Sequence, residues 1–98
     1  MKQLIIQQQA TQEADEAARW YEDQFPSLGV EFLLELDAAL YRVIDNPDIY
    51  QPVYENARRV LVRRFPYAAY FISETGTVRI IAILRQSRNP DVWQSRLP

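Results

Sequence analysis

The fold is decided by the second half of the chain, where residues 58–85 read RRVLVRRFPYAAYFISETGTVRIIAILR. This stretch is rich in β-branched and aromatic residues, and it is interrupted at Phe65-Pro66 and again at Glu-Thr-Gly over residues 74–76. Such interruptions are typical of turns between strands. The pattern therefore predicts three short strands, over residues 58–64, 67–73 and 77–85, paired as an antiparallel meander.

Alternation along the last of these strands places two sets of side chains on opposite faces of the sheet. One set is wholly apolar and is expected to pack on helices: Val78, Ile80, Ala82 and Leu84. The other set is mixed: Arg79, Ile81, Ile83 and Arg85. Because two isoleucines on an outer face are too apolar to be left in water, we expect that face to be partly covered. The cover is either the chain's own C-terminal tail or a partner.

Two amphipathic helices are expected before the strands. From Thr11, which can cap the first helix, small and apolar residues recur at helical spacing until Pro26. The spacing resumes after the turn at residues 27–29 and ends at Asn46-Pro47, where proline stops the second helix. An edge strand is expected within residues 1–8. The prediction is an α+β fold in one domain, residues 1–98, with an N-terminal edge strand and a helix hairpin packed on an antiparallel sheet.

Composition excludes several kinds of function. The 98 residues fit a single domain, and they include no cysteine and no histidine. Disulfides, transition-metal sites and Ser-His or Cys-His catalysis are therefore excluded, and no metal or cofactor is expected. The longest apolar runs are far short of a membrane span, and no signal-peptide pattern opens the chain. We expect a cytoplasmic protein with no membrane contact.

Charge is divided unevenly along the chain. Residues 1–50 hold three basic side chains against ten acidic ones, whereas residues 51–98 hold eight basic side chains, all arginine, against three acidic ones. The planar guanidinium suits bidentate contacts with carboxylate or phosphate, so the second half predicts a basic surface for nucleic acid or an acidic protein. The alternative is that these arginines merely pair with helix carboxylates such as Glu13 or Glu35.

Several local signatures then follow one another along nearly the whole chain. They are Ala14-x-x-Ala17-Ala18-x-Trp20-Tyr21-Glu22, Gly29-x-x-Phe32, Asn46-Pro47, the run from Arg58 to Tyr67, the run from Ile80 to Arg85, Arg88-Asn89-Pro90, Trp93 and Arg96. In this order and spacing the chain resembles the RelE/ParE superfamily of toxins from bacterial type II toxin-antitoxin pairs. It is most similar to the ParE-like, plasmid-stabilisation branch.

The resemblance implies a toxin that a cognate antitoxin neutralises, and two activities occur in the superfamily. ParE-like members poison DNA gyrase by binding, and RelE-like members cut messenger RNA on the ribosome with lysines, arginines and a late tyrosine or histidine. Here the only lysine is Lys2, no tyrosine follows Tyr70, and Arg85 stands where many relatives carry histidine. Because arginine is a poor general base, we expect no catalytic residue and a gyrase-binding toxin. The alternatives are a ribosome-dependent endoribonuclease and an inactive, antitoxin-binding regulatory partner.

The expected partners are the cognate antitoxin and gyrase, with the ribosome and messenger RNA as the alternative target. The assembly is expected to be a homodimer or a toxin-antitoxin hetero-oligomer. Trp93 is also expected to anchor the tail. Candidates for contact with the target are Arg58, Arg59, Arg63, Arg64, Arg85, Arg88 and Trp93. Candidates for contact with an acidic, amphipathic antitoxin segment are Arg79, Ile81, Ile83 and Arg85.

Overall fold

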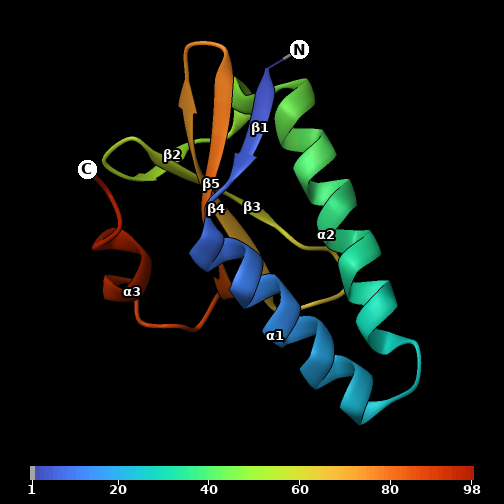
Figure 1. The fold of residues 1–98 in the computed structure, drawn as a ribbon. Helices are drawn as coiled ribbons and strands as arrows, with labels where there is room; N and C mark the ends of the chain where they lie inside the picture. The colour runs from blue at the N-terminus through green and yellow to red at the C-terminus, as the bar shows by residue number, and fades with distance from the viewer. Residues whose placement is uncertain (1) are drawn as a thin grey trace.

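The computed structural model describes residues 2–98 and contains three α-helices, one short 3-10 helix and five strands (Figure 1). In chain order they are β1 (Gln3–Ile6), α1 (Gln8–Gln24), α2 (Leu28–Asp45), η1 (Pro47–Ile49), β2 (Pro52–Tyr54), β3 (Ala57–Leu61), β4 (Tyr67–Glu74), β5 (Thr77–Arg85) and α3 (Asp91–Gln94).

The strands form one sheet in the order β1-β5-β4-β3-β2. Strands β3, β4 and β5 pair antiparallel, as the meander predicts, and β2 also pairs antiparallel to β3. Strand β1 pairs parallel to β5. The α+β class and the N-terminal edge strand are confirmed, but the sheet is mixed rather than wholly antiparallel. The parallel pair needs a long crossover connection, which the α1–α2 hairpin and the rest of the chain supply.

The helix hairpin covers one face of the sheet (Figure 1). Its core contains Phe32, Leu36 and Val43 of α2, all at most 4% exposed. An aromatic cluster closes the end of this core near the β3–β4 turn. There the Tyr21 ring lies 5.4 Å from that of Phe32 and 4.8 Å from that of Phe65. Phe65 of the Arg-Phe-Pro-Tyr run is thus a core residue at a turn between strands.

The predicted division of side chains on β5 is wrong beyond its first residues. The pairing of β4 with β5 shifts register between Tyr70, opposite Ala82, and Phe71, opposite Ile80, so Ile81 is an extra residue. This bulge reverses the alternation. Val78, Ile80 and Ile83 pack in the core under the helix hairpin, whereas Ile81, Ala82 and Leu84 belong to a second core on the opposite face.

The C-terminal tail covers this second core. Trp93 of α3 is 4% exposed and stacks on Tyr70 with ring centroids 4.4 Å apart, and Val92 and Leu97 pack beside it. The expectation that something covers the outer face is therefore met by the chain itself. Trp93 anchors the tail, as predicted.

Some element boundaries differ from those expected, and one strand was not expected. α1 begins at Gln8 rather than at Thr11, so Thr11 is not the cap; its amide donates to the Gln7 carbonyl at 3.0 Å. β3 ends at Leu61 because residues after Val62 form the turn to β4. Strand β2 was not predicted, since Pro52 and its three-residue length give little strand signal. The edge strand expected within residues 1–8 is observed at Gln3–Ile6, and Met1 lies outside the described residues.

Candidate functional site

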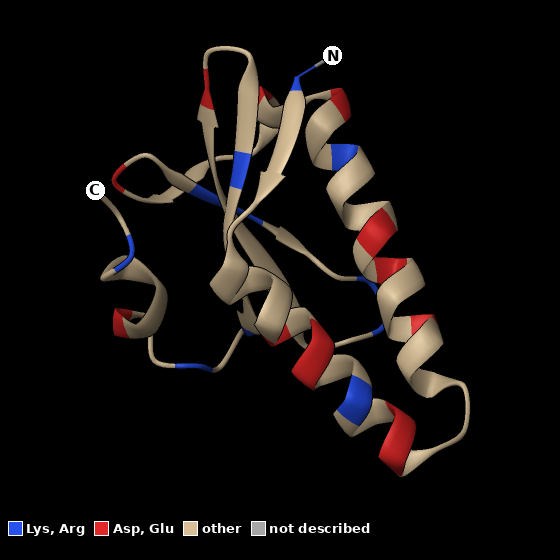
Figure 2. Cartoon of the chain, viewed as in Figure 1, with Lys and Arg blue, Asp and Glu red and all other residues tan. Residues whose placement is uncertain are grey.

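The uneven distribution of charge along the sequence corresponds to an uneven distribution of charge on the folded protein. Acidic side chains are concentrated on α1 and α2, and most arginines lie on the strands and the segments that connect them (Figure 2). The arginines that can contact a partner are those not already engaged within the fold.

Two of the predicted target-binding arginines are engaged in the fold. Arg58 donates to the carbonyls of Asp48 and Tyr50, at 3.2 and 2.6 Å, and so holds η1 to the sheet. Arg64 lies 3.2 Å from Glu31 and 3.7 Å from Glu35, and it adopts a left-handed φ of 71° in the β3–β4 turn. The alternative that helix carboxylates pair with these arginines is thus correct for Arg64.

A third arginine, Arg96, links the C-terminal tail to α1. Its guanidinium donates to both carboxylate oxygens of Glu13, at 2.9 and 2.8 Å, and to the Ile81 carbonyl at 3.0 Å. The same Glu13 carboxylate accepts from the Ile83 amide at 3.1 Å. Glu13 therefore caps the edge of β5 beyond the end of β1 and fastens the tail. Sequence reasoning named Glu13 only as a general partner for arginines.

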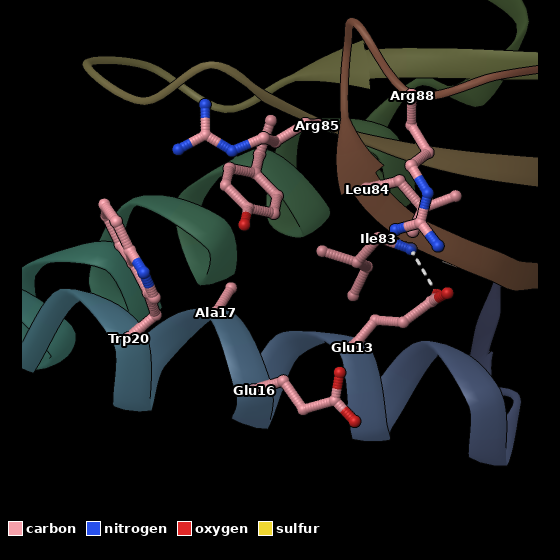
Figure 3. A pocket seen from close by; sticks show the side chains of 9 residues that line it. Glu13, Glu16, Ala17, Trp20, Ile83, Leu84, Arg85 and Arg88 are labelled. Atoms are coloured by element: carbon pink, nitrogen blue, oxygen red, sulfur yellow. Dashed lines mark hydrogen bonds between the residues drawn. The ribbon is translucent and has the colours of Figure 1, made fainter.

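Arg85 and Arg88 line opposite ends of a pocket of about 380 Å³ between α1 and the end of β5 (Figure 3). Arg85 lies over two aromatic rings, 5.7 Å from the centroid of Trp20 and 5.6 Å from that of Tyr67. These distances fall within the range of cation–π attraction. The two rings hold the guanidinium in place, and among residues 2–98 neither arginine forms an ion pair.

Tyr21 neighbours this cluster, with its ring centroid 6.0 Å from that of Tyr67. Burial raises the pKa of Tyr21 above its ordinary value of 10.0, the positive charge of Arg85 opposes that rise, and Tyr67 adds to it. The phenol is therefore neutral at physiological pH and acts as a core group. It is not a proton acceptor poised for chemistry near pH 7.

Of the other predicted site residues, only Ile83 also lines this pocket. Arg59 and Arg63 are exposed elsewhere, on β3 and in the turn that follows it, and Arg79 pairs with Glu74 at 3.1 Å. Ile81 and Ile83, both 1% exposed, lie in the two different cores, so an outer face built from them is wrong. Trp93 is likewise buried and is not available to a target in this structure.

An exposed apolar stripe on α2 was missed by sequence reasoning. Val30, Leu34 and Tyr41 are 58%, 63% and 71% exposed, and Leu33 borders them at 37%. Residues 30, 34 and 41 lie on one side of the helix, opposite the face that packs on the sheet. The sequence signal was available: α2 carries apolar residues at more positions than one buried face can use. A stripe of this kind is typical of an interaction surface.

Two further absences hold for the part of the chain that the structure describes. Residues 2–98 contain no group of three or more potential histidine, cysteine or carboxylate ligands that could hold a metal ion. Within the same range, no helix is both long enough and apolar enough to cross a bilayer.

Comparison with known proteins identifies the family. A solved structure described as "Chromosomal ParDE TA system from P. aeruginosa" superposes with a TM-score of 0.77 at 16% identity, over 87% of this chain and 96% of that one. At this identity the likeness shows the fold alone. Among curated protein sequences, none matches the chain significantly. The family model described as "ParE toxin of type II toxin-antitoxin system, parDE" matches residues 4–90. The chain therefore belongs to the ParE toxin family of type II toxin-antitoxin systems.

Proposed function

We propose that this chain is a binding toxin that acts on DNA gyrase inside the bacterial cell and is neutralised when its cognate antitoxin covers the outer face of α2. The observation that carries the proposal is the exposed stripe of Val30, Leu34 and Tyr41. A toxin held inactive by a protein partner needs an accessible apolar surface that the partner can bury. This stripe offers one without disturbing either core.

A negatively charged residue on the stripe limits which kind of partner can bind there. Asp37 lies between Leu34 and Tyr41 on the same side of α2 and forms no ion pair within residues 2–98. A second copy packed on the stripe in a two-fold arrangement would bring two Asp37 carboxylates close together, which is unfavourable. A partner helix with apolar anchors and one central lysine or arginine fits better. For the surface of α2, this expectation replaces the acidic segment that the sequence predicted on the outer face of the last strand.

Calorimetric titration with the antitoxin, sought as the product of the small neighbouring reading frame, tests the docking surface. Leu34→Asp should weaken the complex at least about 10-fold, because it places a carboxylate against apolar anchors. The matched control is Leu61→Asp, since Leu61 is also exposed, at 47%, but lies on β3. Equal affinities of the two variants would show that the antitoxin binds elsewhere.

Gyrase is favoured as the target because the chain lacks histidine and its buried Tyr21 has a raised pKa. A second candidate function, ribosome-dependent cleavage of messenger RNA, has one observation in its favour. The pocket places Glu16 and Tyr67 beside Arg85 and Arg88, so a carboxylate and a phenol lie near two cations. This proximity was not foreseen, because the sequence argument considered only tyrosines after Tyr70.

Two assays on the purified chain separate these functions. The proposed function predicts inhibition of gyrase supercoiling, with gyrase trapped on cleaved DNA, and intact ribosome-bound messenger RNA. Codon-specific cleavage of that RNA, abolished by Arg85→Gln and unaffected by Arg63→Gln, would establish the nuclease instead. Neither activity, together with harmless expression in bacteria and tight antitoxin binding, would indicate an inactive regulatory partner.

A further inference from the structure

The pocket between α1 and β5 contains a cation that is positioned but unpaired. Guanidinium groups on a protein surface are usually mobile, and ordering one costs side-chain entropy. In this pocket the fold already orders the Arg85 side chain, because its guanidinium lies 5.7 and 5.6 Å from the ring centroids of Trp20 and Tyr67. Trp20 remains 51% exposed although it is large and aromatic. A pre-ordered guanidinium beside an exposed indole is suited to binding a planar anion.

The residues that line the pocket indicate which chemical groups of a ligand would lie next to that anion. Ala17 and Leu84 contribute apolar surface, and Arg88 reaches the pocket from the segment after β5 (Figure 3). Glu13 lines the same space but is neutralised by Arg96. Glu16 is exposed and forms no ion pair within residues 2–98. The pocket is therefore about one positive charge in excess and is partly apolar.

This charge balance favours a single negative group over a polyanion. A phosphodiester strand would bring several charges along this side of α1, where Glu16 and Asp23 are exposed. One carboxylate on an aliphatic stem meets only Arg85, the Trp20 ring and the apolar wall. We propose that the pocket binds one Asp or Glu side chain of a protein partner, with its carboxylate on Arg85 and its stem against Trp20.

The inference rests on the proposed function for the identity of the partner, which is either the antitoxin or gyrase, but its first test needs neither. The full chain is titrated with acetyl-Ala-Leu-Glu-Leu-Ala-amide at low salt, and the indole N–H signal of Trp20 is followed by NMR. The signal is assigned with a Trp20→Phe variant. We expect saturable shifts with a dissociation constant of about 1 mM. The analogue with glutamine in place of glutamate should bind at least about 10-fold more weakly.

Substitutions then test the geometry. Arg85→Gln should abolish the response, and Arg85→Lys should restore it only in part, because lysine keeps the charge but lacks the planar fork. Arg63→Gln is the matched control and should bind as the parent does, since Arg63 is an exposed arginine outside the pocket. Equal binding of the glutamate and glutamine peptides would overturn the proposal. A tighter response to oligouridylate at the same salt would also overturn it and assign the pocket to nucleic acid.

Titration of Arg85→Gln with the antitoxin and with the isolated gyrase subunits distinguishes the two sources of the acidic side chain. A loss of about 10-fold or more with one partner alone assigns the side chain to that partner. Unchanged affinity for both would refute the pocket as a partner site. Failure of the proposed function would be a separate outcome. In that case the chain would still bind the peptide, but it would neither inhibit gyrase nor bind an antitoxin through α2.

Discussion

Glu13 and Arg96 form a two-point ion pair that joins the first helix to the last residues of the chain, with nitrogen–oxygen distances of 2.9 and 2.8 Å. Their side chains are only 16% and 15% exposed. Screening by water is therefore weaker than for a surface pair, and both groups also bond to the β5 backbone, at Ile83 and Ile81. The pair links α1, the edge of the sheet and the tail in one network.

Breaking this pair should loosen the tail. Glu13→Gln leaves the Arg96 charge without its partner, so we expect a loss of about 1–3 kcal/mol in the free energy of unfolding. Urea denaturation measures the loss, and near-UV circular dichroism reports the packing of Trp93. Glu16→Gln is the matched control, because Glu16 is exposed one turn away, and it should change stability by less than about 0.5 kcal/mol. Equal stability of both variants would show that the network does not hold the tail.

The strands and the helix hairpin could be predicted because their signals are local. Periods of two and of 3.6 residues, and the prolines at 26 and 47, are visible within short windows of sequence. The bulge at Ile81 could not be predicted in the same way. It lies within the run Ile80–Leu84, in which every residue is apolar, so no polar side chain marks where the alternation reverses.

The site was less predictable than the fold, since it depends on contacts between distant segments. Arg85 was a candidate by its type and position, but Trp20 and Tyr67, which hold it, were not among the predicted site residues. The same reasoning could not separate Arg85 from Arg64, because engagement of Arg64 by Glu31 and Glu35 arises from tertiary structure. The sequence therefore identified arginine as the type of side chain at the site. It did not show which arginines are free to bind a ligand.

Leu36 tests the buried face of α2. It is 4% exposed, so Leu36→Ala should cost about 2–5 kcal/mol in the free energy of unfolding through lost burial and a cavity. Leu34→Ala is the control on the exposed side of the same helix and should change stability by less than about 0.5 kcal/mol. Thermal or urea denaturation of both variants gives the comparison. Similar losses would mean that the helix faces are wrongly placed.

Gly29 tests how closely the two helices approach. A Cβ atom at this position would lie 2.4 Å from the Ala18 carbonyl oxygen and 3.0 Å from Oε1 of Glu22. The Gly29 amide also donates to that carboxylate at 3.0 Å. Gly29→Ala should therefore destabilise the protein by about 1–3 kcal/mol, although alanine favours helix by about 1 kcal/mol. Val30→Ala, at the exposed neighbour, should be nearly neutral. A Gly29→Ala variant more stable than the parent would show that α1 and α2 separate without cost.

Tyr21 should make stability depend on pH in the alkaline range. Its pKa in the folded state is raised above 10.0, first by burial, so folding favours the neutral phenol. The stabilisation is fully present below pH 10.0 and is lost as pH rises through the raised pKa.

Urea denaturation between about pH 8 and pH 11 should therefore show a steeper decline for the parent than for Tyr21→Phe, which has no proton to lose. Tyr41→Phe is the control, since Tyr41 is 71% exposed, and it should follow the parent. Arg85→Gln adds an independent check: because Arg85 lowers the pKa of Tyr21, its removal should raise the folded-state pKa further, so the alkaline decline should begin at the same pH but become larger and extend to higher pH. Parallel curves for the parent and Tyr21→Phe would show that ionisation of Tyr21 is not coupled to folding.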